Sequence, residues 1–286
     1  MPPSVACGAR IHKQTMRNSI RYTAASLFAG AMLAATAGAQ SVSLKGSDTL
    51  GAKLVPQLAE SFKSKNSGVK FEIAAEGSST AFPALANGTA DIGMSSRKAK
   101  PEEITAARAK GIKLNEIEAC HDMIVVIANK SNPLKNLTKD QVAKIFTGQV
   151  KDWSEVGGSP GPISVYTRNT SSGTYKDWQK LAMKGRNYAP SSQKLAGNEQ
   201  IAEEVSKNKN GIGYVGLAYA KKSGTSPVSI DSIAPIAANA RTYAYSRACY
   251  FYIPEKADAT AKAFIEFAIS KDGQKIAENL GFVPNH

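Results

Sequence analysis

The amino-acid sequence predicts an α/β fold with largely parallel or mixed sheets. Short β-like runs alternate with amphipathic helical runs along most of the chain. A second observation is the run 123–129, which is apolar on both faces, as expected for a strand buried inside such a sheet. The chain has 286 residues, of which 42% are hydrophobic and 21% charged. This composition is ordinary for a globular protein and sufficient for one large core or for two lobes.

The first half of the chain contains three strand-like runs, each followed by a helical run. The predicted strands are residues 41–46, 69–75 and 90–94. The predicted helices are residues 50–65, 81–87 and 101–110. In the first helix the apolar residues Leu54, Leu58 and Phe62 recur on one face, as a helix packed on a sheet requires. Residues 112–118 are mixed in character and are predicted to be extended.

The second half continues this alternation after the buried strand 123–129. The predicted helices are residues 138–147, 175–183, 198–208, 260–270 and 271–280. The predicted strands are residues 163–167, 211–216 and the aromatic region 243–253. In α/β sheets, ligands bind beyond the carboxyl ends of the strands, at the N-termini of the helices that follow. A functional site is therefore expected at such places.

Residues 168–174 (Arg-Asn-Thr-Ser-Ser-Gly-Thr) occupy such a place, between a predicted strand and a predicted helix. Unpaired N–H groups and the positive end of the helix dipole favour an anion there. Arg168 adds a planar fork of donors suited to a tetrahedral oxyanion. Taken alone, a polar turn that caps the helix is the simpler explanation of the segment.

Three further polar clusters share this design, at residues 46–50, 77–80 and 95–97. Each of the four clusters follows a predicted strand, and three of them lead into a helix. Hydroxyl and backbone N–H groups can satisfy all the oxygens of a small tetrahedral anion without a counter-cation. Four such clusters in one chain therefore favour an anion site over helix capping. No Gly-x-x-x-x-Gly-Lys-Ser/Thr loop occurs, so nucleotide hydrolysis is not indicated.

The first 39 residues predict a cleavable signal peptide. Arg17 and Arg21 precede an uncharged, Ala-rich run, and residues 37–39 have the small-x-small pattern of a signal peptidase site. Met16 is an alternative true start, because a complete signal peptide follows it. An uncleaved anchor is the alternative interpretation, but the apolar run is short and weakly hydrophobic for a membrane span. We expect export to a bacterial periplasm.

The formal net charge of the chain is +13 at pH 7. The lysines are scattered, and no dense basic run is interleaved with aromatic residues. Nucleic acid is therefore not the expected partner. A basic surface instead suits a protein that attracts a small anion.

Two cysteines, Cys120 and Cys249, remain after removal of the leader. An even pair in an oxidising compartment predicts one disulfide. Two buried thiols are the alternative, because each cysteine lies beside an apolar, β-like run. The histidines are isolated and no His/Cys cluster has metal-ligand spacing, so we expect neither a metal nor another cofactor.

A serine acyl-enzyme of the kind that acts on β-lactams is a remote alternative. Residues 95–98 match Ser-x-x-Lys, residues 206–208 match Ser-x-Asn, and residues 222–224 resemble Lys-Thr-Gly. The match is poor because Ser-x-x-Lys should open a helix, whereas Pro101 starts a helix of its own. The last two motifs also lie too close together. We therefore predict that the chain is not an enzyme.

Ten segments carry a resemblance to a known family. They are residues 46–50, 77–80, 87–97, 131–134, 145–148 with Trp153, 168–174, 211–215, 246–247, 273–276 and 281–284. Through these segments the chain resembles, nearly end to end, the periplasmic phosphate-binding proteins of phosphate-specific ABC transporters. So many matching segments make the resemblance highly specific.

The resemblance implies a two-lobed, periplasmic-binding-protein-like (type II) fold with mixed sheets and a hinge. Lobe 1 would comprise residues 40–122 plus 245–286, and lobe 2 residues 123–244. It implies a monomer that captures inorganic phosphate between its lobes and delivers it to permease subunits in the inner membrane. Signalling to a sensor is an alternative role. The implied phosphate ligands are Thr49, the Leu50 N–H, Ser78, Ser96, Arg168, Ser172, the Gly173 N–H and Thr174.

Ser96 departs from the pattern of the family, since some members carry an aspartate there. A carboxylate would accept the proton of hydrogen phosphate and repel fully ionised sulfate. A serine can donate or accept, so it discriminates less by itself. Asp48 or Asp122 could take the acceptor role. Another oxyanion such as sulfate therefore stays an alternative ligand.

Overall fold

The structure is a computed structural model, and it describes residues 40–285. The predicted signal peptide, residues 1–39, lies outside the described residues. Among the described residues, no helix has both the length and the apolar character needed to cross a membrane.

Within residues 40–285, nine strands form one mixed sheet, in the order β2-β1-β3-β11-β4-β8-β6-β7, with β9 also paired to β4. The pairs β1–β2, β1–β3, β6–β7 and β6–β8 are parallel, and the others are antiparallel. The predicted mixed α/β class is confirmed. Strands β5 and β10 form a separate, parallel two-stranded sheet. The strands of both sheets are β1 Gln40–Gly46, β2 Val69–Ala74, β3 Ile92–Ser95, β4 Leu114–Asn129, β5 Asn136–Leu137, β6 Ser164–Arg168, β7 Gln193–Leu195, β8 Gly211–Gly216, β9 Thr225–Pro227, β10 Ser229–Ile230 and β11 Ser246–Pro254.

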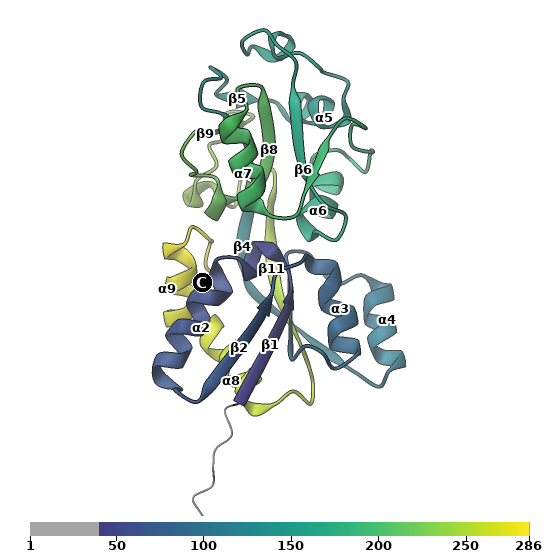
Figure 1. Ribbon diagram of the computed structural model, residues 1–286, viewed down its shortest axis with the longest axis vertical. Coiled ribbons are helices and arrows are strands. Elements are labelled where there is room, and N and C mark those ends of the chain that lie inside the picture. The colour runs from purple at the N-terminus through teal and green to yellow at the C-terminus, as the bar shows by residue number, and fades with distance from the viewer. Residues whose placement is uncertain (1–39, 286) are drawn as a thin grey trace, which may run out of the picture. The chain divides into compact units, whose positions relative to one another are not determined.

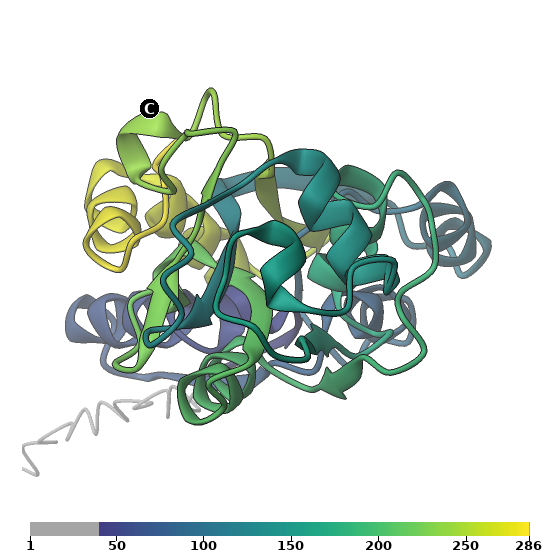
Figure 2. The same cartoon turned by 90° about the horizontal axis from the view of Figure 1, so that it is seen from above.

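Helices flank this sheet, and their boundaries lie close to the predicted ones. The two C-terminal helices, α8 and α9, pack beside α2, so the yellow and purple ends of the described chain lie together in Figure 2. The helices are α1 Asp48–Gly51, α2 Leu54–Lys65, α3 Ser78–Ala86, α4 Pro101–Ala109, α5 Lys139–Thr147, α6 Gly173–Leu181, α7 Asn198–Lys207, α8 Ala259–Ile269 and α9 Lys271–Asn279.

The apolar side chains gather in two main cores. One core takes its residues from the segment 123–245. The second core combines residues 42–120 with residues 249–282, so it joins the two ends of the described chain. Each core covers its own part of the sheet, and in Figure 1 the two groups of elements meet where β4 and β11 are labelled. This division is the physical basis of the two lobes.

Strand β4 connects the two cores. Its first part pairs with β11 through residues 114–123, and its last part pairs with β8 and β9 through residues 124–129. The sequence predicts an extended segment and a separate strand here, whereas the structure has one strand of 16 residues. The reason is that Asp122 interrupts the apolar pattern although it is completely buried within the strand.

Cys120 and Cys249 are free thiols in the structure, and both are buried. They lie directly opposite each other on the neighbouring strands β4 and β11. The side-chain hydrogen bond between Cys120 and Cys249, together with burial, raises the pKa of the Cys120 thiol well above its usual value. The predicted disulfide is therefore not formed, and the alternative of two buried thiols describes this pair.

The stability of the second lobe should depend on Trp178. Its buried ring stacks on Tyr214, with centroids 4.6 Å apart, and meets Phe146 and Tyr245 edge-on at 5.0 and 4.8 Å. We expect Trp178→Ala to lower the free energy of unfolding by about 3–5 kcal/mol. Leu181→Ala on the same helix is the control, because Leu181 is 39% exposed and should lose less than about 1 kcal/mol. Urea unfolding measures both, and equal losses would contradict this packing.

Candidate functional site

The structure brings the four polar clusters together. Strand β1 ends at Gly46 just before α1, and β6 ends at Arg168 just before α6. Strand β3 ends at Ser95, next to Ser96. The third helix starts at Ser78 rather than at residue 81, so the cluster 77–80 forms its first turn. The clusters thus lie at strand ends and helix N-termini, where backbone N–H groups lack intrahelical partners.

Direct contacts join the clusters in pairs. Thr49 Oγ1 lies 3.2 Å from Thr174 Oγ1, and the two hydroxyls share a hydrogen bond. Ser78 Oγ lies 3.2 Å from Ser96 Oγ and accepts a hydrogen bond from the Ser96 N–H at 3.0 Å. Gly173 faces this serine pair so closely that an added Cβ would lie 2.4 Å from Ser78 Oγ. Residues of the segments 40–122 and 123–245 therefore meet in one buried polar cluster, called the chamber below.

The side chains of this chamber are almost completely buried. Burying a polar group is costly unless it is hydrogen-bonded, and the hydroxyls of this chamber bond to one another, to the Tyr175 N–H and to Arg247. Leu50 is also buried, and its N–H lies in the first turn of α1. The buried polar side chains are Thr49, Ser78, Ser96, Arg168, Ser172 and Thr174.

Arg168 supplies a positive charge to the chamber. Its Nε and Nη2 donate to the Ala196 carbonyl at 3.1 and 2.7 Å. Its Nη1 lies 3.2 Å from Asp48 Oδ2, yet this buried nitrogen has no hydrogen-bond partner among the described residues. Burial lowers the pKa of Arg168, and the nearby Asp48 opposes that shift. A buried guanidinium with an unpartnered donor is suited to an anion.

Asp48 is already used as an acceptor by its surroundings. Its Oδ2 accepts hydrogen bonds from the N–H and the Nδ2 of Asn198, at 3.0 and 2.6 Å. Asp122 accepts from the Leu217 N–H at 3.1 Å and from Arg247 at 3.1 Å. Both carboxylates therefore already accept hydrogen bonds from groups of the protein.

Helix capping accounts for only one of the three helix starts. Ser172 Oγ accepts a hydrogen bond from the Tyr175 N–H at 3.2 Å, so this serine does cap α6. The residues that precede α1 and α3, Ser47 and Gly77, make no side-chain capping bond. The capping alternative therefore does not explain the clusters 46–50 and 77–80.

Sequence reasoning missed Arg247 and Asp177 as members of this region. Arg247 is the second residue of the aromatic strand β11, and its guanidinium reaches Thr174 Oγ1 at 2.8 Å and Asp177 Oδ2 at 3.2 Å. An arginine inside an apolar strand is itself a signal, since unpaired charges are rarely buried. Burial raises the pKa of the Asp122 and Asp177 carboxyls, and Arg247 opposes both shifts.

The motifs of the serine enzyme are not assembled. Ser95 Oγ donates to the Arg97 carbonyl at 2.7 Å, while Lys98 is exposed and lies 3.5 Å from Glu116. Residues 157–161 also match Gly-x-Ser-x-Gly, but this segment follows a 3₁₀ helix and Ser159 is exposed. Residues 211–216 likewise match Gly-x-Gly-x-x-Gly, but they form strand β8 rather than a strand-to-helix turn. Among the described residues no group of His, Cys, Asp or Glu side chains could hold a metal ion.

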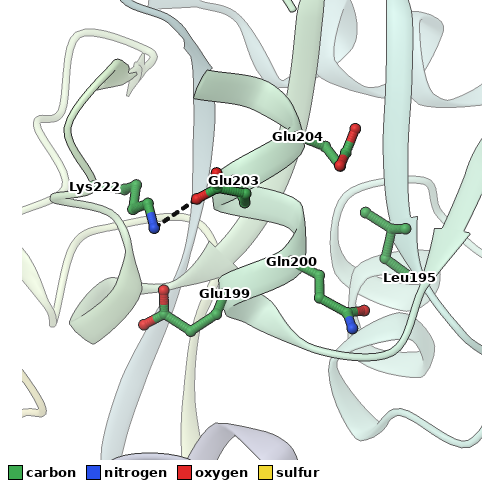
Figure 3. Close-up of a pocket in the computed structure, with 6 residues that line it drawn as sticks. All are labelled: Leu195, Glu199, Gln200, Glu203, Glu204 and Lys222. Carbon is green, nitrogen blue, oxygen red and sulfur yellow. Dashed lines mark ion pairs between the residues drawn. The ribbon is translucent and has the colours of Figure 1, made fainter. Parts of the chain in front are cut away.

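A cavity of about 510 Å³ lies elsewhere, on helix α7 (Figure 3). Three glutamates line it, Glu199, Glu203 and Glu204, together with one cation, Lys222. Hydrogen bonds from Lys222 and Lys207 lower the pKa of Glu203 to about 2, so it stays ionised at neutral pH. Such a negative lining is unsuited to an anion.

The comparisons with known proteins agree with this site and fold. A family model described as the PBP superfamily domain matches residues 33–272, so the chain belongs to this superfamily. The phosphate-binding protein PstS of Pseudomonas aeruginosa is 34% identical over 266 residues, covering 84% of this chain and 81% of that protein. PstS of Bacillus subtilis is 30% identical, covering 85% and 80%. The chain therefore belongs to the family of the PstS phosphate-binding proteins.

Solved structures extend this similarity to the whole fold. A protein of Clostridium perfringens, described as a phosphate ABC transporter substrate-binding protein with bound phosphate, superposes with a TM-score of 0.80 at 33% identity. The match covers 86% of this chain and 100% of that one. An ABC-type phosphate transport receptor of Vibrio cholerae matches with a TM-score of 0.69 at 26% identity, covering 85% and 99%. The predicted family and its two-lobed fold are confirmed.

Gly173→Ala should separate the two halves of the chamber. The added Cβ would lie 2.4 Å from Ser78 Oγ and 2.6 Å from Ser96 Oγ. We expect a loss of about 1–3 kcal/mol in the free energy of unfolding, because the crowded side chains must move. Gly68→Ala is the control, since nothing lies within 4 Å of an added Cβ there. Urea unfolding compares the two variants. A free energy of unfolding in Gly173→Ala equal to that of the wild type would contradict the close approach of Gly173 to Ser78 and Ser96.

Proposed function

We propose that the chain binds inorganic phosphate in this chamber and closes its two lobes around it. The observation that carries the proposal is the buried Nη1 of Arg168, which has no hydrogen-bond partner among the described residues although it lies 3.2 Å from Asp48 Oδ2. A tetrahedral oxyanion can provide the acceptor that this nitrogen lacks, and it would make a charge-assisted hydrogen bond there. The names of the PstS relatives support phosphate as the oxyanion.

The proposed ligands come from both lobes, with lobe 1 formed by residues 40–122 plus 245–286 and lobe 2 by residues 123–244. Strands β4 and β11 would form the hinge, because they carry the chain between the two cores. Hydroxyls, a guanidinium and N–H groups at helix N-termini would surround the phosphate. The proposed ligands are Thr49, Leu50, Ser78, Ser96, Arg168, Ser172, Gly173 and Thr174.

Selectivity for phosphate over sulfate requires an acceptor for the proton of hydrogen phosphate. Asp48 and Asp122 both accept hydrogen bonds from protein N–H groups, so they are poor choices. Among the described residues, Ser96 Oγ shares its one side-chain hydrogen bond with the Ser78 hydroxyl, and a hydroxyl can accept as well as donate. We therefore assign the acceptor role to Ser96.

The transport role follows from the same proposal. The mature chain, beginning at Gln40, would work in the periplasm as a monomer and deliver phosphate to the permease subunits of an ABC importer. The relatives and solved structures carry the names of binding and transport proteins, which supports a role without catalysis. The predicted export signal supports the compartment.

Calorimetric titration near neutral pH tests the proposal. Phosphate should bind, and Arg168→Ala should weaken binding about 10- to 150-fold, because a buried charge-assisted hydrogen bond is worth about 1.5–3 kcal/mol. Arg108→Ala, which removes an exposed arginine of α4, is the control and should bind as tightly as the wild type. Tight sulfate binding without phosphate binding would overturn the assignment of phosphate as the ligand. Unchanged phosphate affinity in Arg168→Ala would show that the binding site does not lie in the chamber.

A further inference from the structure

We propose that Arg247 is a second arginine of the anion site and acts on the bound oxyanion together with Arg168. The inference rests on the proposed phosphate-binding function. Arg247 lies on β11 and Arg168 at the end of β6, so the two arginines reach the chamber from different lobes.

Arg247 contacts two hydroxyls of the proposed ligand set. Its Nη2 donates to Thr174 Oγ1 at 2.8 Å and lies 3.5 Å from Thr49 Oγ1. Those two hydroxyls share one hydrogen bond of 3.2 Å between them. The two hydroxyls have two hydrogens and their shared bond uses one, so the other remains to be donated elsewhere while Arg247 occupies an acceptor position of Thr174. Arg247 thereby prepares the threonine pair as a donor toward an anion.

Arg247 also keeps an unused donor of its own. Its Nε is buried and has no hydrogen-bond partner in the part of the chain that the structure describes. Buried N–H groups are nearly always paired in folded proteins, so an unpartnered one next to a proposed ligand site points to a ligand. Arg168 shows the same feature at its Nη1.

Carboxylates hold Arg247 from two sides. Its Nη2 lies 3.1 Å from Asp122 Oδ2, and its Nη1 lies 3.2 Å from Asp177 Oδ2 on α6. The arrangement mirrors Arg168, whose Nη1 lies 3.2 Å from Asp48 on the other lobe. Burial lowers the pKa of Arg168, and the charge of Arg247 lowers it further, so the two guanidinium groups act on each other. An anion between them relieves this repulsion.

Arg247 also reaches an outer cavity, although its side chain is buried. It lines a cavity of about 460 Å³ whose walls come from both lobes. The cavity contains one acid, Asp177, and a basic wall that can attract an anion from solution. Arg247 thus belongs to both the outer cavity and the buried chamber. The other basic residues of the cavity are Arg97, Lys98, Lys100, Lys176 and Lys180.

The alternative is that Arg247 is only a structural link between the lobes. The two roles predict different results for its partner Asp177. If the ion pair merely holds the lobes together, losing either member should weaken phosphate binding alike. If Arg247 acts on the anion, losing Asp177 removes a negative charge beside the ligand and leaves the guanidinium in place.

Calorimetric titration of inorganic phosphate into the mature chain, near neutral pH, separates the two roles. We expect Arg247→Gln to weaken binding about tenfold or more. Arg247→Lys should fall between this variant and the wild type, because it keeps the charge but not the planar fork. Asp177→Asn should bind at least as tightly as the wild type. Arg241→Gln, which removes an exposed arginine, is the control and should be unchanged.

Two results would overturn the inference. One is wild-type affinity in Arg247→Gln, and the other is a tenfold or greater loss in Asp177→Asn. The second result decides the matter even where Arg247→Gln does not fold. Wild-type protein that binds no phosphate would instead overturn the proposed function, so the two failures are distinguishable.

Discussion

The burial of Arg168 is the constraint on which the rest of the site depends. A guanidinium cannot be moved out of water unless charged or polar partners replace its hydration. The Ala196 carbonyl and Asp48 provide part of this replacement, and Asp48 is held in turn by Asn198. Because Asp48 opens α1 and Asn198 opens α7, the same network ties the two lobes together. The remaining donor, Nη1, makes the closed chamber suited to an anion.

The topology of the sheet explains why the chamber lies between the lobes. Strands β1 and β3 end on one side of it, and β6 ends on the other, so three short polar turns converge. Strands β4 and β11 are continuous beneath these turns and carry the chain between the two cores. Movement at these two strands can separate the turns without disturbing either core. This is the mechanical requirement for a protein that captures a ligand and later releases it.

Local patterns in the sequence predicted most of the elements and the residues of the chamber. The apolar face of α2 and the uninterrupted run at 123–129 were sufficient for their assignments, because burial imposes a clear periodicity there. The four clusters were recognisable because strand, polar turn and helix follow one another directly along the chain. What the sequence could not reveal depends on pairing between distant segments. Arg247 and Asp177 are 70 positions apart and become neighbours only through folding.

A crystal structure of the mature chain grown with inorganic phosphate tests the central claim most directly. The account predicts one phosphate in the chamber, with its oxygens at hydrogen-bond distance from Arg168, Thr49, Ser78 and Thr174. In that structure the Arg168 Nη1 should have a phosphate oxygen as its partner. Phosphate bound only elsewhere, with Arg168 contacting nothing but Asp48 and Ala196, would contradict the account.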